Sequence, residues 1–390
     1  MKRPSASLLR TLSVSGLVGL SLLLSGCGAL RDDEGRPLTT LSPKGPQAQR
    51  IDDLVSPVFL VAGVVFVIVE VAVVYMAWRF RRRKDDVDEV DEPVQHHGNP
   101  KLEWAWTILP AILLLGLGIV NVQVIWDLDA VPKDHMTVEV YGQQWWWEYR
   151  YDTDNDGKAD IITANQMVIP VGKFVETTIR SNDVIHSFWI PALNGKRDAV
   201  PGHSNRWSLQ ADEPGVFQGT CTEYCGLSHA YMRMEVKAVP PAEFAKWVKE
   251  QKQPAEKPAE DSLAGKGFAE FKNNCAQCHQ VNGNSYKFAE ETDGAPDLDY
   301  GGADHPLTAA NAPNLTHLMS RNKFAGNLFD LYTTDPDTGE RVADESALGS
   351  WLRDPAAMKP MAADQNRGMP NLNLTQEQID ALVAYLHTLK

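Results

Sequence analysis

The stretch CTEYCGLSHAYM at residues 221–232 combines cysteine, histidine and methionine side chains within twelve residues. Two thiols, Cys221 and Cys225, lie four residues apart, and the imidazole of His229 and the thioether of Met232 follow them. A second imidazole is available upstream at His186. Sulfur and imidazole ligands together suit copper, and two bridging thiolates would spread a charge change over two metal ions. A disulfide, a zinc half-site and a copper-chaperone motif can share this cysteine spacing.

The residues around this motif, 136–239, have the composition of short strands. Segments rich in Val, Ile, Thr and aromatic side chains alternate with Gly, Pro, Asn and Asp. Turn signals at intervals of about ten residues are typical of a small β-sandwich. Asp152, Asp154 and Asp156 resemble the first half of a calcium loop, but Thr163 stands where that loop needs a glutamate. We therefore favour a hairpin turn at Gly157 over a calcium site.

Two apolar runs, 54–78 and about 104–126, precede the strand-rich region, and each is long enough to cross ~30 Å of hydrocarbon as a helix. Basic residues at positions 79 and 81–84 follow the first run, which predicts a cytoplasmic turn there. Everything after Asp127 is then expected outside the cytoplasm. Glu70 lies within the first run, where a charge is expensive, and faces either a polar partner or a proton path.

The N-terminus resembles an export signal, with Lys2, Arg3 and Arg10 ahead of an apolar run. The run ends in LSGC at residues 24–27, which resembles a lipoprotein signal-peptidase site. We expect residues 1–27 to form a signal peptide and Cys27 to be lipidated. An uncleaved membrane helix is the alternative.

The sequence CAQCH at residues 275–279 is the attachment motif of c-type haem. Cys275 and Cys278 would form thioethers with the haem, and His279 would be the proximal iron ligand. Helical segments are expected at 263–274 and 375–389, the second with a capping box of Thr375 and Gln378. A methionine downstream would be the second axial ligand and would raise the haem potential. The four candidates are Met319, Met358, Met361 and Met369.

The cysteine count and the charge narrow the function further. Of the five cysteines, one lies in the export signal, two in the copper motif and two in the haem motif, so none is left for a structural disulfide. A net charge of -14 argues against nucleic acid as a partner. The Pro-, Ala-, Glu- and Lys-rich stretch 249–262 has the composition of a linker.

Residues 56–248 resemble subunit II of the haem-copper oxidases. The resemblance rests on EWAWT at 103–107, QWWW at 144–147, HS at 186–187, DAVPG at 198–202 and the complete 221–232 motif. The family often has Arg after this Pro-Gly pair, and here His203 stands in that position as an expected surface or interface residue. The resemblance implies a dinuclear copper A centre whose ligands are Cys221, Cys225, His186, His229, Met232 and the backbone oxygen of Glu223.

Other roles implied by this family fall on three residues. The Glu223 side chain would bind Mg²⁺ at the border with subunit I. Trp145 matches the tryptophan through which electrons enter the copper site. Glu103 matches a carboxylate at the cytoplasmic mouth of a proton path, although its plain interpretation is a polar residue at a helix end.

Residues 263–390 resemble a small single-haem cytochrome c. Met369-Pro370, shortly before the final helix, matches the family's axial methionine, and Met361 is the second candidate. Residues 312–315 resemble the segment whose proline packs beside the proximal histidine, with Ala312 where Gly is common. The stretch 281–311 has no assigned role.

The expected fold is therefore multi-domain. It comprises a transmembrane hairpin of two α-helices (51–128), a cupredoxin-like β-sandwich (130–248), a linker (249–262) and an all-α cytochrome c domain (263–390).

The resemblance implies an electron relay from haem c through copper A to subunit I, where oxygen is reduced to water with proton pumping. It also implies a protein of the cytoplasmic membrane with both redox domains on the outer, periplasmic face. Expected partners are subunit I, subunit III and a donor such as cytochrome c or a cytochrome bc complex; no oxygen-reducing site is expected in this chain. Nitrous or nitric oxide reductase subunits, a quinol oxidase subunit and a copper-delivery protein are the alternatives.

Overall fold

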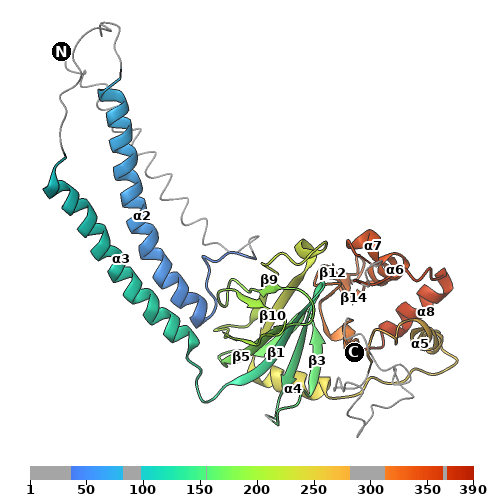
Figure 1. Ribbon diagram of the computed structural model, residues 1–390. Coiled ribbons are helices and arrows are strands. Elements are labelled where there is room, and N and C mark those ends of the chain that lie inside the picture. The colour runs from blue at the N-terminus through green and yellow to red at the C-terminus, as the bar shows by residue number, and fades with distance from the viewer. Residues whose placement is uncertain (1–36, 82–97, 155, 282–311, 363–366) are drawn as a thin grey trace. The chain divides into compact units, whose positions relative to one another are not determined.

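The computed structural model describes residues 37–81, 98–154, 156–281, 312–362 and 367–390 (Figure 1). The predicted signal peptide with Cys27 and almost all of the stretch 281–311 lie outside these residues. The chain divides into two compact units, one of residues 49–130 and one that contains residues 131–390 and the described residues before 49.

The smaller unit is built from helices α2 (Pro46–Arg79) and α3 (Pro100–Asp129). Both are long and apolar enough to cross a membrane, as the sequence predicts, and most of their large apolar side chains are exposed. Arg50 of α2 pairs with Asp127 of α3 at 2.9 Å. Glu70 lies within α2 with its side chain exposed.

Glu103 lies in the first turn of α3 and takes part in capping it. The Asn99 side chain accepts hydrogen bonds from the backbone N–H groups of Lys101 and Leu102, and Glu103 Oε1 accepts one from Asn99 N at 3.1 Å. Glu103 is therefore a polar residue at a helix end, which is its plain interpretation.

The larger unit begins with the predicted sandwich. One sheet has the order β3-β2-β1-β5-β8 and the other β4-β10-β9. Their bounds are β1 Met136–Gln143, β2 Trp146–Asp152, β3 Ile161–Ala164, β4 Gln166–Pro170, β5 Val175–Ser181, β8 Asn205–Leu209, β9 Gly215–Thr220 and β10 Arg233–Val239. A separate pair joins β6 (His186–Phe188) to β7 (Arg197–Ala199). Side chains of both large sheets, such as Val140, Tyr149 and Val236, share one buried core.

The aspartate-rich segment forms the turn that the sequence favours. Strands β2 and β3 pair antiparallel on either side of it. The Asp152 carboxylate accepts hydrogen bonds from the backbone N–H groups of Asp156 and Gly157, and Gly157 has a φ of +84°. The turn therefore uses these carboxylates to satisfy its own backbone.

Helix α4 (Pro241–Gln251) follows the sandwich and reaches into the predicted linker. The buried ring of His317 lies within hydrogen-bond distance of the carbonyl oxygens of Gln251, Gln253 and Lys390. The beginning of the linker is thereby tied to the C-terminal domain.

The C-terminal domain is mainly helical, with α5 Leu263–Asn274, α6 Glu345–Arg353, α7 Pro355–Met358 and α8 Gln376–Leu386. The capping box of Thr375 and Gln378 is present, as predicted. Helices α5 and α8 pack closely, since a Cβ on Gly267 would lie 1.8 Å from the carbonyl oxygen of Ala381. The sequence does not predict two short hairpins, β11–β12 (Lys323–Phe324 with Phe329–Asp330) and β13–β14 (Tyr332–Thr334 with Arg341–Ala343).

Candidate metal centre and haem cavity

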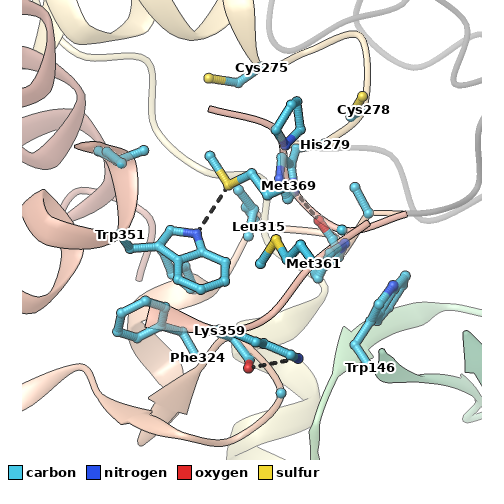
Figure 2. Close-up of a pocket in the computed structure, with 18 of the residues that line it drawn as sticks. Trp146, Cys275, Cys278, His279, Leu315, Phe324, Trp351, Lys359, Met361 and Met369 are labelled. Atoms are coloured by element: carbon cyan, nitrogen blue, oxygen red, sulfur yellow. Dashed lines mark hydrogen bonds between the residues drawn. The ribbon is translucent and has the colours of Figure 1, made fainter. Parts of the chain in front are cut away.

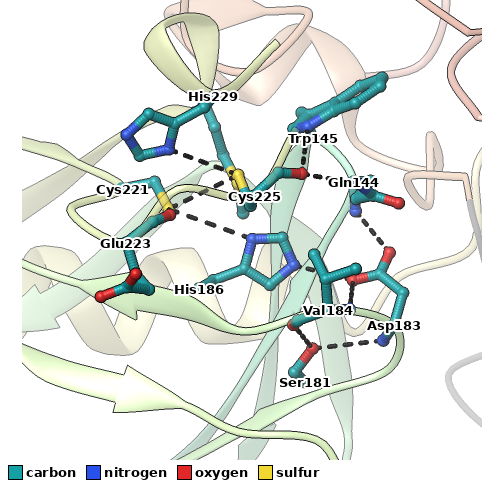
Figure 3. Close-up of polar contacts among 11 residues, drawn as sticks. Gln144, Trp145, Ser181, Asp183, Val184, His186, Cys221, Glu223, Cys225 and His229 are labelled. Atoms are coloured by element: carbon teal, nitrogen blue, oxygen red, sulfur yellow. Dashed lines mark hydrogen bonds and ion pairs between the residues drawn. The ribbon is translucent and has the colours of Figure 1, made fainter. Parts of the chain in front are cut away.

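The cysteine motif forms the loop between β9 and β10, which are antiparallel neighbours (Figure 3). A short 3-10 turn, η1 (His229–Tyr231), lies within it. The Cys221 and Cys225 sulfur atoms are buried and 3.8 Å apart. A disulfide bond joins sulfur atoms at about 2.05 Å, so both cysteines are free to bind metal.

The remaining predicted ligands surround this sulfur pair. His186 Nδ1 lies 4.0 Å from Cys221 Sγ, and His229 Nδ1 lies 3.5 Å from Cys225 Sγ. Met232 Sδ lies 3.8 Å from Cys225 Sγ, and the Glu223 carbonyl oxygen lies 3.3 Å from Cys221 Sγ. The fold therefore brings together all six predicted ligand atoms, and this set of thiolate, imidazole and thioether donors fits copper.

The two thiols share a proton. The hydrogen bond from Cys225 lowers the pKa of Cys221 to about 4, whereas the same contact raises the pKa of Cys225. The imidazole of His186 also stabilises the Cys221 thiolate. Metal binding must release the remaining proton, because a thiolate is the form that binds metal.

Asp183 orients one of the histidine ligands. Its Oδ1 lies 2.8 Å from His186 Nε2, and a carboxylate can only accept, so Nε2 donates and Nδ1 faces the sulfur pair. Burial alone would raise the pKa of Asp183, but hydrogen bonds from His186 and from the Gln144 N–H hold this pKa below its usual value. Sequence reasoning missed Asp183, and its only signal is its place three residues before His186.

Replacing Asp183 with Asn is expected to weaken copper binding about 10- to 100-fold, because the amide removes the negative charge that fixes the imidazole. The measurement is a titration of the metal-depleted complex with copper in competition with a chelator. Asp212→Asn, which changes an exposed aspartate of the same domain, is the control. Equal affinities of the two variants would contradict a positioning role for Asp183.

Trp145 contacts the copper loop directly. Its indole Nε1 donates to the Cys225 carbonyl oxygen at 2.9 Å, and Gln144 Nε2 donates to the same oxygen. Gly226 permits this approach, because a Cβ there would lie 2.9 Å from Gln144 Nε2 and 3.2 Å from the Trp145 ring. The predicted residue for electron input is thus hydrogen-bonded to the backbone of a predicted copper ligand.

The other predicted residues of this region are exposed. The Glu223 side chain is exposed on the ligand loop, whereas its carbonyl oxygen points inward to Cys221 Sγ. His203 is exposed on the segment between β7 and β8, as expected of a surface or interface residue.

A cavity of about 550 Å³ is lined by all three residues of the haem motif, Cys275, Cys278 and His279 (Figure 2). Burial raises the pKa of Cys275 to about 12 and lowers the pKa of His279, so the thiol and the imidazole are both neutral near pH 7. His279 Nδ1 donates to the Pro313 carbonyl oxygen at 2.9 Å, which leaves Nε2 available to a metal. The proline segment therefore lies beside the histidine, as the resemblance implies.

Met369 and Met361 both line this cavity. The indole Nε1 of Trp351 donates to Met369 Sδ at 3.1 Å, which fixes the position of that sulfur atom (Figure 2). Gly368, at a φ of +85°, allows Met361 to pack against the backbone next to Met369, since a Cβ there would lie 2.7 Å from Met361 Sδ.

The buried side chain of Arg321 bears on whether haem fits this cavity. Its guanidinium is buried in the cavity wall, donates to the Asn314 carbonyl oxygen, and leaves Nε without a hydrogen-bond partner among the described residues. A buried cation needs an anion or a polar ligand. A carboxylate-bearing group such as haem would supply one, so the residues present fit the cofactor. Nothing in the sequence distinguishes Arg321 from a surface arginine.

The sandwich also contributes to the wall of this cavity. Trp145 lines it. Trp146 also lines it, together with Lys359 of the C-terminal domain (Figure 2). Trp145 is 4% exposed and Lys359 is 4% exposed, so both are covered. Sequence reasoning identified Trp145 but neither Trp146 nor Lys359 as part of this region.

Three family models match the chain in succession. They are the cytochrome c oxidase subunit II transmembrane domain (residues 42–124), the periplasmic domain of the same subunit (136–239) and cytochrome c (264–390). The chain is 36% identical over 381 residues to cytochrome c oxidase subunit 2 of Alkalihalophilus pseudofirmus, with 95% of each chain covered. It is 34% identical over 397 residues to the same subunit of Bacillus sp. (strain PS3), with 98% and 97% covered.

Among solved structures, the periplasmic domain of subunit II of cytochrome oxidase from Bradyrhizobium japonicum is 35% identical, with a TM-score of 0.29 over 32% of this chain and 97% of that one. The two curated relatives match almost end to end, and the models account for the helices, the sandwich and the C-terminal domain in that order. The chain therefore belongs to the cytochrome c oxidase subunit 2 family, and it carries a cytochrome c domain at its C-terminal end.

Proposed function

We propose that this chain is the electron-input subunit of a haem-copper terminal oxidase. Electrons pass from its own haem c to a dinuclear copper A centre and on to subunit I, where oxygen is reduced to water and protons are pumped. The observation that carries the proposal is the placement of Trp145, which lines the cavity of the haem motif and donates to the carbonyl of Cys225. One residue thereby joins the two predicted redox sites.

The copper site would be held by the residues already described. Cys221, Cys225, His186 and His229 would hold the two copper ions, and Met232 and the Glu223 carbonyl would be weaker ligands. The buried thiolates and the rigid strands β9 and β10 on either side keep the ligands in place when the charge changes. When bound, the copper pair and the haem supply one-electron chemistry that no side chain offers.

The haem would be attached through Cys275 and Cys278 and held by His279 and Met369. The hydrogen bond from Trp351 to Met369 Sδ supports this methionine over Met361 as the axial ligand. Coordination by histidine and methionine gives a haem potential suited to a donor of an oxidase.

The membrane and partner assignments follow the same reasoning. Two helices long enough to span, with basic residues after α2, support a multi-pass protein of the cytoplasmic membrane with its redox domains on the outer face. Three exposed apolar side chains lie beside the predicted copper ligands: Ile185, Tyr224 and Leu227. They support the proposal that a partner protein covers this face. We assign it to subunit I, with Mg²⁺ at Glu223 and proton uptake near Glu103.

The remaining partners are subunit III and a donor such as cytochrome c or a cytochrome bc complex. Cys27 would anchor the mature N-terminus through its lipid. Tethering the haem domain raises its effective concentration at the copper site to the millimolar range, which removes the need for a diffusing carrier at that step.

The test is oxygen uptake by the complex purified through a tag on this chain, with an artificial one-electron donor. Cyanide-sensitive uptake is expected. If a complex that has kept its copper and haem consumes nitric oxide and no oxygen, the oxidase assignment is wrong and a nitric oxide reductase is the correct class.

A further inference from the structure

The C-terminal domain contacts the copper loop through two segments, the β11–β12 hairpin and residues 359–361. The N–H of Arg233, at the start of β10, donates to the Gly326 carbonyl oxygen at 3.1 Å. The hydroxyl of Ser228, next to the copper ligand His229, donates to the Pro360 carbonyl oxygen. Both contacts involve the loop 221–232 or the residue after it, so the C-terminal domain packs against the loop that carries the predicted ligands.

Gly326 shows how close this approach is. It has a φ of +85°, and a Cβ there would lie 2.7 Å from Lys359 Nζ, 2.9 Å from the Tyr231 carbonyl oxygen and 3.2 Å from the Trp145 carbonyl oxygen. Only glycine fits a turn that is surrounded by backbone of the copper domain. The hairpin turn is therefore shaped to meet that surface.

Lys359 is the buried amine of this contact. Its Nζ donates to the Trp145 carbonyl oxygen at 2.7 Å and to the Ala325 carbonyl oxygen at 3.1 Å. One amine thus joins the hairpin turn of the C-terminal domain to the residue whose indole donates to Cys225. A buried amine is costly unless its N–H groups are hydrogen-bonded, so the position of this amine depends on both carbonyl oxygens.

Glu235 is a second anchor, on the copper-domain side. It is 1% exposed, and its carboxylate accepts hydrogen bonds from four side-chain amides. Gln166 and Gln218 come from the neighbouring strands β4 and β9, whereas Asn322 and Asn327 come from the C-terminal domain at 3.3 Å. A buried carboxylate needs these donors, and half of them are present only when the two domains are in contact.

We propose that Lys359 is a positioning residue for electron transfer, which together with the Glu235 amide cluster fixes the haem domain on the Trp145 segment. The inference rests on the proposed relay and adds a structural condition to it. Lys359 holds the Trp145 backbone against the β11–β12 turn at the wall of the haem cavity, and it is not among the predicted ligands of copper or haem. Its loss leaves both redox centres intact and loosens the contact between them.

The test measures transfer from haem to copper within the intact complex. A photoreductant delivers one electron to the haem, and the near-infrared absorbance of the copper pair reports its arrival. Lys359→Met removes the amine and keeps the length of the side chain. We expect this transfer to slow about tenfold or more, the order of loss that small misplacements of reacting groups produce, with unchanged spectra of both centres.

Lys323→Met is the matched control, since Lys323 lies on the β11–β12 hairpin whose turn Lys359 contacts, and it pairs at 3.3 Å with Asp330 inside the C-terminal domain. It is expected to leave the rate unchanged. Asn327→Gly is the second variant, because glycine keeps the φ of +62° at this position while the amide that donates to Glu235 is lost. It is expected to slow transfer even if Lys359→Met does not assemble.

The outcomes separate this inference from the relay. If the haem of the unmodified complex is reduced and the copper pair receives no electron, both fail. If the unmodified complex transfers the electron and both Lys359→Met and Asn327→Gly transfer it equally fast, the relay stands and the positioning role is wrong.

Discussion

Cys225→Ser is expected to abolish the copper centre and to lower oxygen uptake by more than about a hundredfold, since a loss of this size can follow even from changing a residue that only supports a metal ligand. Cys225 is at the centre of the site, because its sulfur lies near Cys221, His229 and Met232 and its carbonyl accepts from Trp145. The hydroxyl of serine cannot replace a bridging thiolate. The haem domain is expected to stay intact and to accumulate reduced haem.

The measurements for this variant are the copper content, the electron paramagnetic resonance spectrum and oxygen uptake of the purified complex. Thr222→Ala is the control, because it changes a side chain of the same loop whose buried hydroxyl has no hydrogen-bond partner among the described residues. Oxygen uptake at the unmodified rate by a copper-free Cys225→Ser complex would show that electrons bypass the copper site.

Met369→Leu is expected to remove the sulfur ligand of the haem iron while preserving the volume of the side chain. The haem potential should fall by roughly 0.1 V or more, since axial ligands set haem potentials over a range of roughly 0.8 V and methionine raises them. Redox titration of the haem absorbance measures the shift. The covalent attachment through Cys275 and Cys278 should be unaffected.

Met361→Leu is the matched control, because this methionine lines the same cavity while the Trp351 indole donates to Met369 instead. Its haem potential is expected to change little. A large fall for Met361→Leu together with an unchanged potential for Met369→Leu would assign the axial position to Met361.

The predictable part of the site lies in short contiguous motifs. Five of the six predicted copper ligands fall within residues 221–232, so a single loop between β9 and β10 fixes their arrangement. The haem motif is equally local. Only His186 had to be brought in from elsewhere, and the pairing of β6 with β7 beside the loop does so. Local motifs of this kind require little knowledge of tertiary packing.

The contact between the two domains could not be predicted in this way. Lys359 and Glu235 have the sequence appearance of surface residues, and both are buried because amide or carbonyl groups from distant segments meet them. Asp183 and Arg321 are also defined by tertiary packing rather than by a motif. Periodicity reports which face of an element is apolar, and it says nothing about a polar side chain whose partners come from another domain.

The proposed relay has a fixed order, haem first and copper second. The most direct test mixes the intact complex rapidly, without oxygen, with a one-electron donor, and follows the haem and copper absorbances together. We expect haem reduction to come first and copper reduction to follow at the rate of haem reoxidation. Copper reduction that precedes haem reduction, or that proceeds at the same rate when the haem stays oxidised, would contradict it.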